Sequence, residues 1–585
     1  MAEIPIKVKH QGKVYDLEIN TDSTGEELKI QLYSLTNVEP ENQKVLAKKL
    51  VKDDTPLSSL GLKPGQTITL MGTPSAEVVM EIPKEKMKFA EDMTEAELAQ
   101  RDGAIPAGLQ NTGNTCYANA TLQTLRSIPE LQQELMNYTP SAAASSSAAS
   151  SMFSADQLAQ YGIGGLGGGN DLTTALRDLY TQMGGTQQGF PPIMFLTTLR
   201  QKFPQFAERA KSGHGYAQQD AEEVWTQLVQ TLHESLKLPG EDAQKYKSWV
   251  GKYMAGSFEV ITSCDDAPEE ESVTQTEEFH DLKCNITGDV NHLPEGIRIA
   301  LNEKLEKNNP TLGREATYTR SSRISRLPKH LPIHLIRFFW RKDTQKKAKI
   351  MKKLTFQHEI DVTEFCTEEL RKKLVPVRDK IREVRKEEED VERAKKRQKR
   401  VKAQEEIEAK ESKVRADEPM QKLKEKAEKE KAKGTAGEGE KAANGDSAKQ
   451  GAEEEKHKTD DELEKERADK LASMKQDVLS AVHEDLKKDP TANQTGLYEL
   501  RALVTHQGSS GDSGHYTAYV KKTAPKVGGV EDGNWWWFND EKVQEVSAEK
   551  IETLAGGGET HSALILLYRA VELPTMEKPD VEMKA

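Results

Sequence analysis

A long charged segment, residues 367–490, separates two stretches that have the residue pattern of a folded domain. An apolar stripe with heptad-like spacing recurs among its dense Lys, Arg and Glu, at Leu374, Val377, Ile381, Val384 and Val391. The later part, KGTAGEGEKAANGDSAKQGAEEE, loses all periodicity, and globular patterning resumes at TGLYELRALVTHQG and runs to Arg569. The pattern therefore predicts a solvated insertion within one domain, a helical hairpin or coiled coil with a disordered tip.

The cysteines and the net charge limit the class of protein. Four cysteines stand singly in 585 residues, without a CxxC pair: Cys116, Cys264, Cys284 and Cys366. This usage favours a reducing compartment and no cofactor. The net charge of −13 disfavours nucleic acid and anionic membranes as partners. The chain begins without a signal peptide and has no run of transmembrane length, so we expect a soluble intracellular protein, cytoplasmic and nuclear.

The first 75 residues have the pattern of a small separate domain. Alternating apolar residues predict two strands around a turn at residues 10–12, followed by a helix and further short strands. This order is similar to the ubiquitin fold, and TPLSSLGLKPGQTITL is its most specific phrase. The unit ends in MGTPSAE without a diglycine, so we expect a ubiquitin-like domain, 1–75, that is neither conjugated nor cleaved off.

The rest of the chain divides by composition. We expect a linker at 76–104 with a short acidic helix around Thr94–Gln100, a large domain at 105–570 and a tail at 571–585. Within the large domain, the Ala/Ser/Gly-rich stretch 141–170 predicts a surface loop.

Cys116 lies between a Gly/Asn/Thr-rich stretch and a run with helical spacing, in GLQNTGNTCYANATLQTL. The unpaired N–H groups and dipole of a helix start favour a thiolate, which is what a thiol nucleophile needs. Taken alone, a cysteine before a helix is more often a core residue.

A second stretch, SGHYTAYVKK, places His515 at the start of an apparent strand, and NWWWFNDEKV brings Asn539 and Asp540 after a return strand. An Asn or Asp beside a histidine can orient the imidazole of a Cys–His pair. Singly, His515 could be a surface histidine and Asn539 a turn residue. Together with Cys116 they indicate nucleophilic catalysis.

These two stretches resemble the cysteine and histidine boxes of the ubiquitin-specific proteases. YAQQDAEEVWTQLVQTL (216–232) and ISRLPKHLPIHLIRFFW (324–340) resemble that family's other two signatures, in the same order. The N-terminal domain and the phrase FAEDMTEAELA narrow the resemblance to members that associate with the proteasome. It implies an α+β fold: a ubiquitin-like β-grasp domain and a papain-like catalytic domain with thumb, palm and fingers.

The resemblance also implies roles for individual residues. Cys116 matches the nucleophile, His515 the general base and Asn539 the third member of the triad, with Asp540 able to share in holding the imidazole. Asn111 matches the side chain that donates to the oxyanion.

For ubiquitin binding, the resemblance implies contacts at Asp220, Gln219, Gly514 and Tyr516. Proteasome binding is expected at Leu46 and Met71, for which a core position is an equal alternative. Many relatives hold zinc with two CxxC knuckles in the fingers, whereas only Cys264 and Cys284 stand in that region, so no zinc is expected there.

The predicted function is a thiol-dependent deubiquitinase that hydrolyses isopeptide bonds at the C-terminal glycine of ubiquitin. Ubiquitin, ubiquitinated proteins and the proteasome regulatory particle are its expected partners. A catalytically silent ubiquitin-binding adaptor and a structural coiled-coil protein are the alternatives. Residues 506–514 and 341–353 read as exposed loops beside the groove for ubiquitin's tail, and we expect them to hold the isolated enzyme in a poorly active state.

Overall fold

The computed structural model describes residues 3–72, 93–140, 171–341, 346–430, 460–523 and 531–575, except residues 211–214, 511–512 and five shorter gaps. The chain forms two compact units, Met1–Asp92 and Met93–Ala585. The predicted loop 141–170, the predicted disordered tip of the insertion and the end of the tail lie outside the described residues. No helix in the described ranges is long and apolar enough to cross a bilayer.

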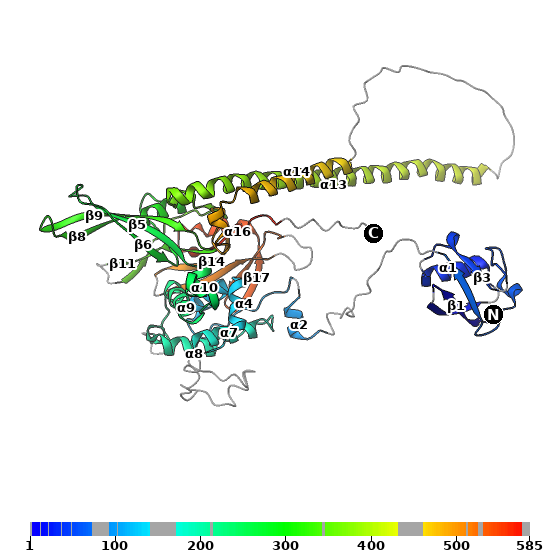
Figure 1. Ribbon diagram of the computed structural model, residues 1–585, viewed down its shortest axis with the longest axis horizontal. Helices are drawn as coiled ribbons and strands as arrows, with labels where there is room; N and C mark the ends of the chain where they lie inside the picture. The colour runs from blue at the N-terminus through cyan, green and yellow to red at the C-terminus, as the bar shows by residue number, and fades with distance from the viewer. Residues whose placement is uncertain are drawn as a thin grey trace, which may run out of the picture. The chain divides into compact units, whose positions relative to one another are not determined.

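The first unit is a four-stranded sheet with one helix (Figure 1). Its elements are β1 (Glu3–His10), β2 (Lys13–Asn20), α1 (Gly25–Thr36), β3 (Lys44–Leu46) and β4 (Thr67–Met71), and the strand order is β2-β1-β4-β3. Strands β1 and β4 are parallel and the other pairs antiparallel. Leu28 and Leu32 of α1 pack on the apolar face of the sheet, which gives the unit its own core.

The second unit is built on a mixed ten-stranded sheet. The main path runs β17-β16-β15-β14-β18-β10-β7, while β12 and β13 pair with β14, and β11 pairs with β12. The bounds are β7 (Leu282–Asn285), β10 (His330–Ile336), β11 (Phe338–Arg341), β12 (Lys346–Lys349), β13 (Glu359–Asp361), β14 (Leu497–Ser510), β15 (Ser513–Lys521), β16 (Trp535–Asn539), β17 (Lys542–Val546) and β18 (Ser562–Ala570).

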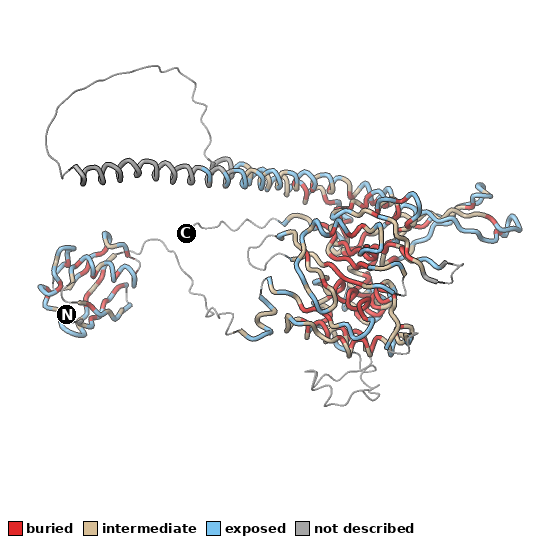
Figure 2. Tube along the Cα trace, turned by 180° about the vertical axis from the view of Figure 1, so that it is seen from behind, coloured by how far each residue is buried: buried red, intermediate tan, exposed pale blue. Residues whose placement is uncertain are grey.

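Alternate side chains along the central strands enter different cores. On β14, Ala502 and Val504 pack into one cluster while Leu503 packs into the other. On β18, Ile565 and Leu566 are divided in the same way. Both faces of these strands are therefore covered, which explains their near-continuous apolar sequence. Figure 2 shows the buried strands at the centre of this unit.

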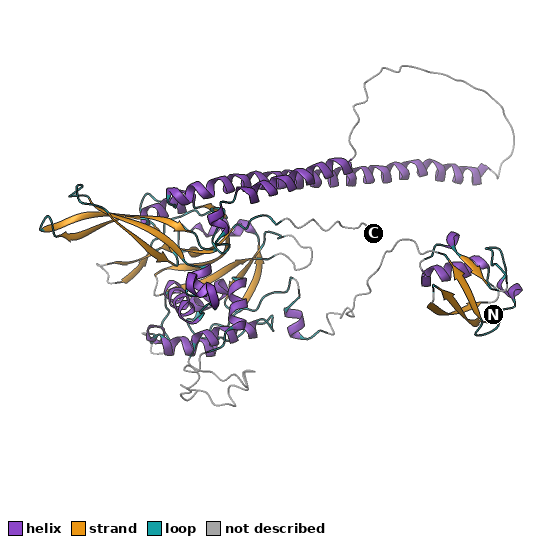
Figure 3. Ribbon diagram, in the orientation of Figure 1, coloured by secondary structure: helices purple, strands orange, loops and turns teal. Residues whose placement is uncertain are grey.

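One face of the sheet is covered by helices from the first third of the unit (Figure 3). They are α3 (Cys116–Arg126), α4 (Pro129–Asn137), α7 (Leu172–Met183), α8 (Ile193–Lys202), α9 (Ala221–Ser235), α10 (Gly240–Tyr246) and α11 (Trp249–Tyr253). Helix α3 is buried at every position from Cys116 to Leu125 and packs against β15 and α9. A helix buried all round needs little amphipathic pattern, which is why its sequence mixes Ala and Leu with small polar residues.

A second, four-stranded antiparallel sheet has the order β6-β5-β9-β8. Its strands are β5 (Gly256–Cys264), β6 (Val273–Phe279), β8 (Asn302–Asn309) and β9 (Arg314–Arg326), and α12 (Leu293–Ala300) precedes β8. Cys264 ends β5 in this sheet, whereas Cys284 lies on β7 in the ten-stranded sheet.

The charged insertion forms two long helices, α13 (Glu368–Glu430) and α14 (Asp460–Ala481), followed by α15 (Glu484–Lys487). They run antiparallel, because Lys380 contacts Asp477 while Glu387 contacts Lys470 further along (Figure 1). We call residues 368–391 of α13 and 470–481 of α14 the stem.

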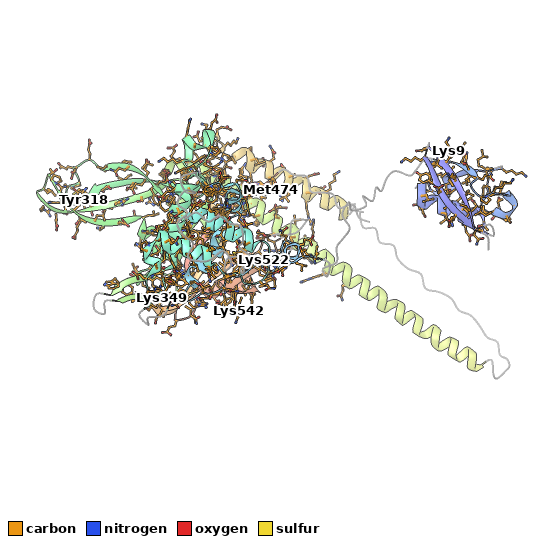
Figure 4. The ribbon with its side chains drawn as sticks, turned by 90° about the horizontal axis from the view of Figure 1, so that it is seen from below. Lys9, Tyr318, Lys349, Met474, Lys522 and Lys542 are labelled. Atoms are coloured by element: carbon orange, nitrogen blue, oxygen red, sulfur yellow. The ribbon has the colours of Figure 1, made fainter. Side chains whose placement is uncertain are left out.

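The stem corrects the prediction of a solvated insertion. Leu374, Val377, Ile381 and Val384 are buried in the same core as β14 and β18, and Val391 is half-buried. From α14, Val478 is buried there and Met474, labelled in Figure 4, packs against the cluster. The heptad-like stripe is thus an apolar helix face, and the domain core covers much of it.

Two further short helices, α2 and α16, belong to the second unit. Helix α2 (Glu95–Ala99) lies where the short acidic helix is expected, and it begins with the capping box of Thr94 and Glu97. Thr186 donates to Glu95 (2.5 Å) and Gln187 to the Leu98 carbonyl (2.9 Å), so α2 is docked on the second unit and is not a free linker. Helix α16 (Ala548–Glu552) lies between β17 and β18.

Candidate active site

Cys116 is the first residue of α3 and is only 3% exposed. The preceding segment is fastened to this helix by buried amides: Gln123 donates to the Ala107 carbonyl (2.9 Å), and Asn119 donates to the carbonyls of Leu109 and Gln110. These bonds satisfy polar groups that burial would otherwise penalise. They also fix the loop before Cys116 relative to its helix.

That loop is organised by Asn111. Its side-chain oxygen accepts from the N–H groups of Gly113 (3.0 Å) and Thr115 (3.2 Å). Gly113 and Asn114 both have positive φ, 107° and 53°, which explains the Gly-Asn pair in the sequence. The Asn111 amide donates to Asp540 (3.0 Å). An amide group carries two N–H bonds, so Asn111 has a second N–H besides the one that contacts Asp540.

His515 lies on β15 and Asn539 ends β16, the neighbouring strand. The imidazole Nε2 is 2.6 Å from the side-chain oxygen of Asn539. Because an amide oxygen only accepts, Nε2 is the protonated nitrogen and Nδ1 is the one that can take a proton. The N–H of the next residue, Tyr516, is directed at the sulfur of Cys116, so the sulfur lies against the same strand as the histidine.

Asp540 has a different role from the one expected. It does not share in the hydrogen bond to the imidazole; its carboxylate accepts from Asn111 (3.0 Å) and Asn119 (2.8 Å), and its carbonyl from the Leu109 N–H (3.0 Å). Its φ of 52° turns the chain sharply after Asn539. Asp540 therefore links the end of β16, which carries Asn539, to the loop before Cys116, and positions these two segments relative to each other.

The chain matches known families at both ends. A family model described as ubiquitin carboxyl-terminal hydrolase matches residues 107–568, and one described as ubiquitin family matches residues 6–75. Ubiquitin carboxyl-terminal hydrolase 6 of Schizosaccharomyces pombe is 37% identical over 97% of this chain and 99% of its own. The chain belongs to the ubiquitin carboxyl-terminal hydrolase family.

Two further relatives match the hydrolase over 97% of its length. Ubiquitin carboxyl-terminal hydrolase 7 of Arabidopsis thaliana is 34% identical, with 99% of its length covered, and ubiquitin carboxyl-terminal hydrolase 14 of Caenorhabditis elegans is 27% identical, with 93% covered. The hydrolase is thus a cysteine-type deubiquitinating enzyme with an N-terminal ubiquitin-like domain. This confirms the predicted α+β fold and enzyme class, and it removes the coiled-coil protein as an alternative.

Opposing effects act on the pKa of the Cys116 thiol. Burial raises its pKa to about 11, and the negative charge of Asp540 acts in the same direction. The N–H groups of Tyr516 and Tyr117 favour the thiolate but do not outweigh burial. The N–H groups at the helix start thus act in the expected direction, and burial acts against them.

Asp220 caps α9, where its carboxylate accepts from the N–H of Glu222 (3.1 Å). It lines a cavity of about 420 Å³ together with Glu222, Glu223 and three polar residues, Gln205, Thr226 and Gln227. Three carboxylates thus line this cavity, and that of Glu222 also contacts His334 (3.2 Å). Gln219 precedes the cap and is half-buried.

Gly514 and Tyr516 are placed differently from the other predicted ubiquitin contacts. A Cβ on Gly514 would lie 2.2 Å from the Gln507 carbonyl, and its φ is 134°, so glycine is required by the fold itself. The Tyr516 side chain is 1% exposed and packs edge-on against His506 (4.7 Å). Its side chain is a core group that cannot reach ubiquitin in this state.

Three polar groups near the site were missed by the sequence reasoning. Asn119, three residues after Cys116, stood out only as an amide in a buried helix. Lys349 of β12 is buried and donates to the His506 carbonyl (2.7 Å). Burial and the charge of Arg337 lower the pKa of Lys349 to about 8, and burial and the charge of Lys349 lower that of His506 to about 3.

Proposed function

We propose that Cys116 is the nucleophile of this deubiquitinase, His515 its general base and Asn539 the residue that orients the imidazole. The observation that carries the proposal is the 2.6 Å contact of His515 with Asn539 on strands packed against the start of α3. These residues come from segments about 400 positions apart in the sequence.

In the proposed reaction, His515 Nδ1 takes the Cys116 proton as sulfur attacks the carbonyl of ubiquitin's C-terminal glycine. The second N–H of Asn111 and backbone N–H groups near Cys116 stabilise the oxyanion. Collapse releases the substrate lysine, protonated by His515, and water hydrolyses the thioester. Asp220 and the acidic cavity hold the basic tail of ubiquitin.

A ubiquitin derivative with a C-terminal thiol-reactive group distinguishes an active enzyme with Cys116 as nucleophile from a catalytically silent ubiquitin-binding adaptor. The active enzyme gains the mass of one ubiquitin, and peptide mapping locates the bond at Cys116. An adaptor binds the derivative without forming a covalent bond.

We further propose that the enzyme trims ubiquitin from substrates bound at the proteasome, and that it docks through the first unit. The register of β3 and β4 places Leu46 and Met71 on the same side of the sheet, opposite α1. They are 45% and 55% exposed, so they form a surface and not a core. An apolar surface on a domain without a diglycine fits a docking role.

Deleting residues 1–75 is expected to abolish proteasome association and leave basal hydrolysis unchanged, because the catalytic unit has its own cores. In the full chain, Leu46→Glu with Met71→Glu should have the same effect, measured by pull-down with purified proteasomes. Ile30→Glu is the matched control, because Ile30 is equally exposed (51%) but lies on α1. Retention of proteasomes by the truncated chain, or equal loss with the control, would contradict the assignment.

Parts of the two segments expected to cover the groove are strands in the structure. Residues 338–341 and 346–349 are the paired strands β11 and β12, and Ala348 of β12 pairs with Ser510 of β14. Lys349, labelled in Figure 4, anchors this pairing from within the protein. Residues 342–345 and 511–512 of the two predicted loops lie outside the described residues. A state in which the groove for ubiquitin's tail is covered gains support, because β14, the strand that leads to His515, pairs with β12.

We propose that proteasome docking favours a form in which β12 has left β14. Hydrolysis of a fluorogenic ubiquitin substrate should then rise about 5- to 150-fold on adding proteasomes whose own deubiquitinases are silenced. Ala348→Pro, which removes a strand N–H, should raise the basal rate and reduce the activation. Equal rates with and without proteasomes would refute the gating and leave the catalytic assignment unaffected.

A further inference from the structure

A histidine pair and a carboxylate meet where α9 approaches the four-stranded sheet. His233 lies in the last turn of α9, Glu278 lies on β6, and His280 follows the end of β6. One candidate ligand atom from each lies within 4.8 Å of the other two. The imidazole rings of His233 and His280 are 5.3 Å apart between centroids, and His280 Nε2 is 3.1 Å from the Glu278 carboxylate.

This cluster is separate from the catalytic centre and from the cysteines considered for zinc. Neither Cys264 nor Cys284 belongs to it. Among the described residues it is the one group of His, Cys, Asp and Glu whose atoms are close enough to share a metal ion. Two imidazoles and a carboxylate are a donor set suited to zinc and neighbouring divalent transition metals.

The ring of His233 is already oriented by a second residue. Its Nδ1 is 2.8 Å from the hydroxyl of Ser248, a fully buried residue at the start of α11. The same hydroxyl accepts from the Gly251 N–H (3.1 Å), so its position is fixed. If Nδ1–H donates to Ser248, the lone pair of Nε2 is free for a metal, which is the usual arrangement around a metal-bound histidine.

We propose that His233, Glu278 and His280 form a binding site for a divalent transition metal, zinc by preference, which ties the end of β6 to the end of α9. Tetrahedral zinc places its N and O ligands about 3.4 Å apart. Glu278 is exposed and both histidines are half-buried, so small side-chain rotations close the cluster to that distance. Water completes the fourth position.

The positive charges around the cluster weaken its expected affinity for a metal cation. Burial and His280 lower the pKa of His233, Glu278 acts in the opposite direction, and Lys237 and Lys247 add further repulsion. One carboxylate against two ammonium groups predicts a weaker site than a structural cysteine site. A tightly held, permanently bound ion is not expected.

The test uses the full chain with Cys116→Ala, which removes the catalytic thiol as a competing ligand. Isothermal titration of the EDTA-treated protein with ZnCl₂ is expected to give one ion per chain. The affinity should fall more than about tenfold in His280→Ala and in Glu278→Gln. His483→Asn is the matched control, because it replaces an exposed histidine at a helix start with another good capping residue.

Two further readouts keep the result interpretable. Thermal unfolding without metal shows whether each variant is folded. If His280→Ala is not folded, Glu278→Gln, at an exposed position, still tests the metal site. Cobalt(II) should give a visible spectrum without the intense thiolate charge-transfer band. The proposal is overturned if the parent chain takes up no zinc, if both variants bind it like the control, or if the thiolate band appears.

Discussion

Replacing Cys116 by alanine is expected to lower ubiquitin hydrolysis by about 10⁴-fold or more, because no other group in the site can form the thioester. Binding of ubiquitin should persist. Cys116 is 3% exposed, so removal of its sulfur changes almost no surface, and the acidic cavity at Asp220 is untouched. Turnover of a fluorogenic ubiquitin substrate measures the first quantity, and calorimetric titration with ubiquitin measures the second.

Cys264→Ala is the control for this result. Cys264 is also buried, at 5% exposure, but it lies in the four-stranded sheet at the end of β5. Its replacement should cost some stability and leave the rate unchanged. Residual hydrolysis by Cys116→Ala above a trace, or an equal loss in Cys264→Ala, would show that the nucleophile lies elsewhere.

Replacing His515 by alanine is expected to be almost as severe, with a loss of about 10²- to 10⁴-fold, because general base catalysis is removed. Asn539→Ala should cost less than His515→Ala. The imidazole then loses its 2.6 Å partner and its fixed orientation, but the nucleophile and base both remain. The rate of adduct formation with thiol-reactive ubiquitin orders the three proteins.

Asn534→Ala is a suitable comparison for the last variant. Asn534 directly precedes the same strand, β16, and its amide contacts Glu545 on the surface. It should behave like the parent enzyme. A larger loss in Asn539→Ala than in His515→Ala would mean that Asn539 holds the fold of the strand end and does not act through the imidazole.

The sequence was sufficient for those parts of the fold and site that depend on local pattern. The helix start at Cys116 and the strands around His515 could be predicted because each has a period and a boundary signal within a dozen residues. Leu46 and Met71 remained ambiguous, since an apolar residue in a short strand fits either face until the register is known.

Properties set by distant neighbours could not be predicted. The raised pKa of Cys116 depends on burial against β15 and on Asp540, more than 400 positions away. The role of Asp540 follows from its contacts with Asn111 and Asn119, which only the assembled fold brings together. Residues 506–510 look like a Gly/Ser-rich loop, but they form the end of β14, where Gln507 pairs with His515 of β15 and Ser510 with Ala348 of β12.

The stem divides the insertion into two regions with different tolerance to change. Within the stem, Arg385 contacts Glu359 of β13 and Glu499 of β14 (2.7 Å). Apolar stem residues are buried in the same core as residues of these strands. A shift of one residue here would turn the apolar face of the helix away from the core by about 100°. A change of length outward from the stem leaves these contacts in place, so related chains should differ most in length between residues 392 and 469.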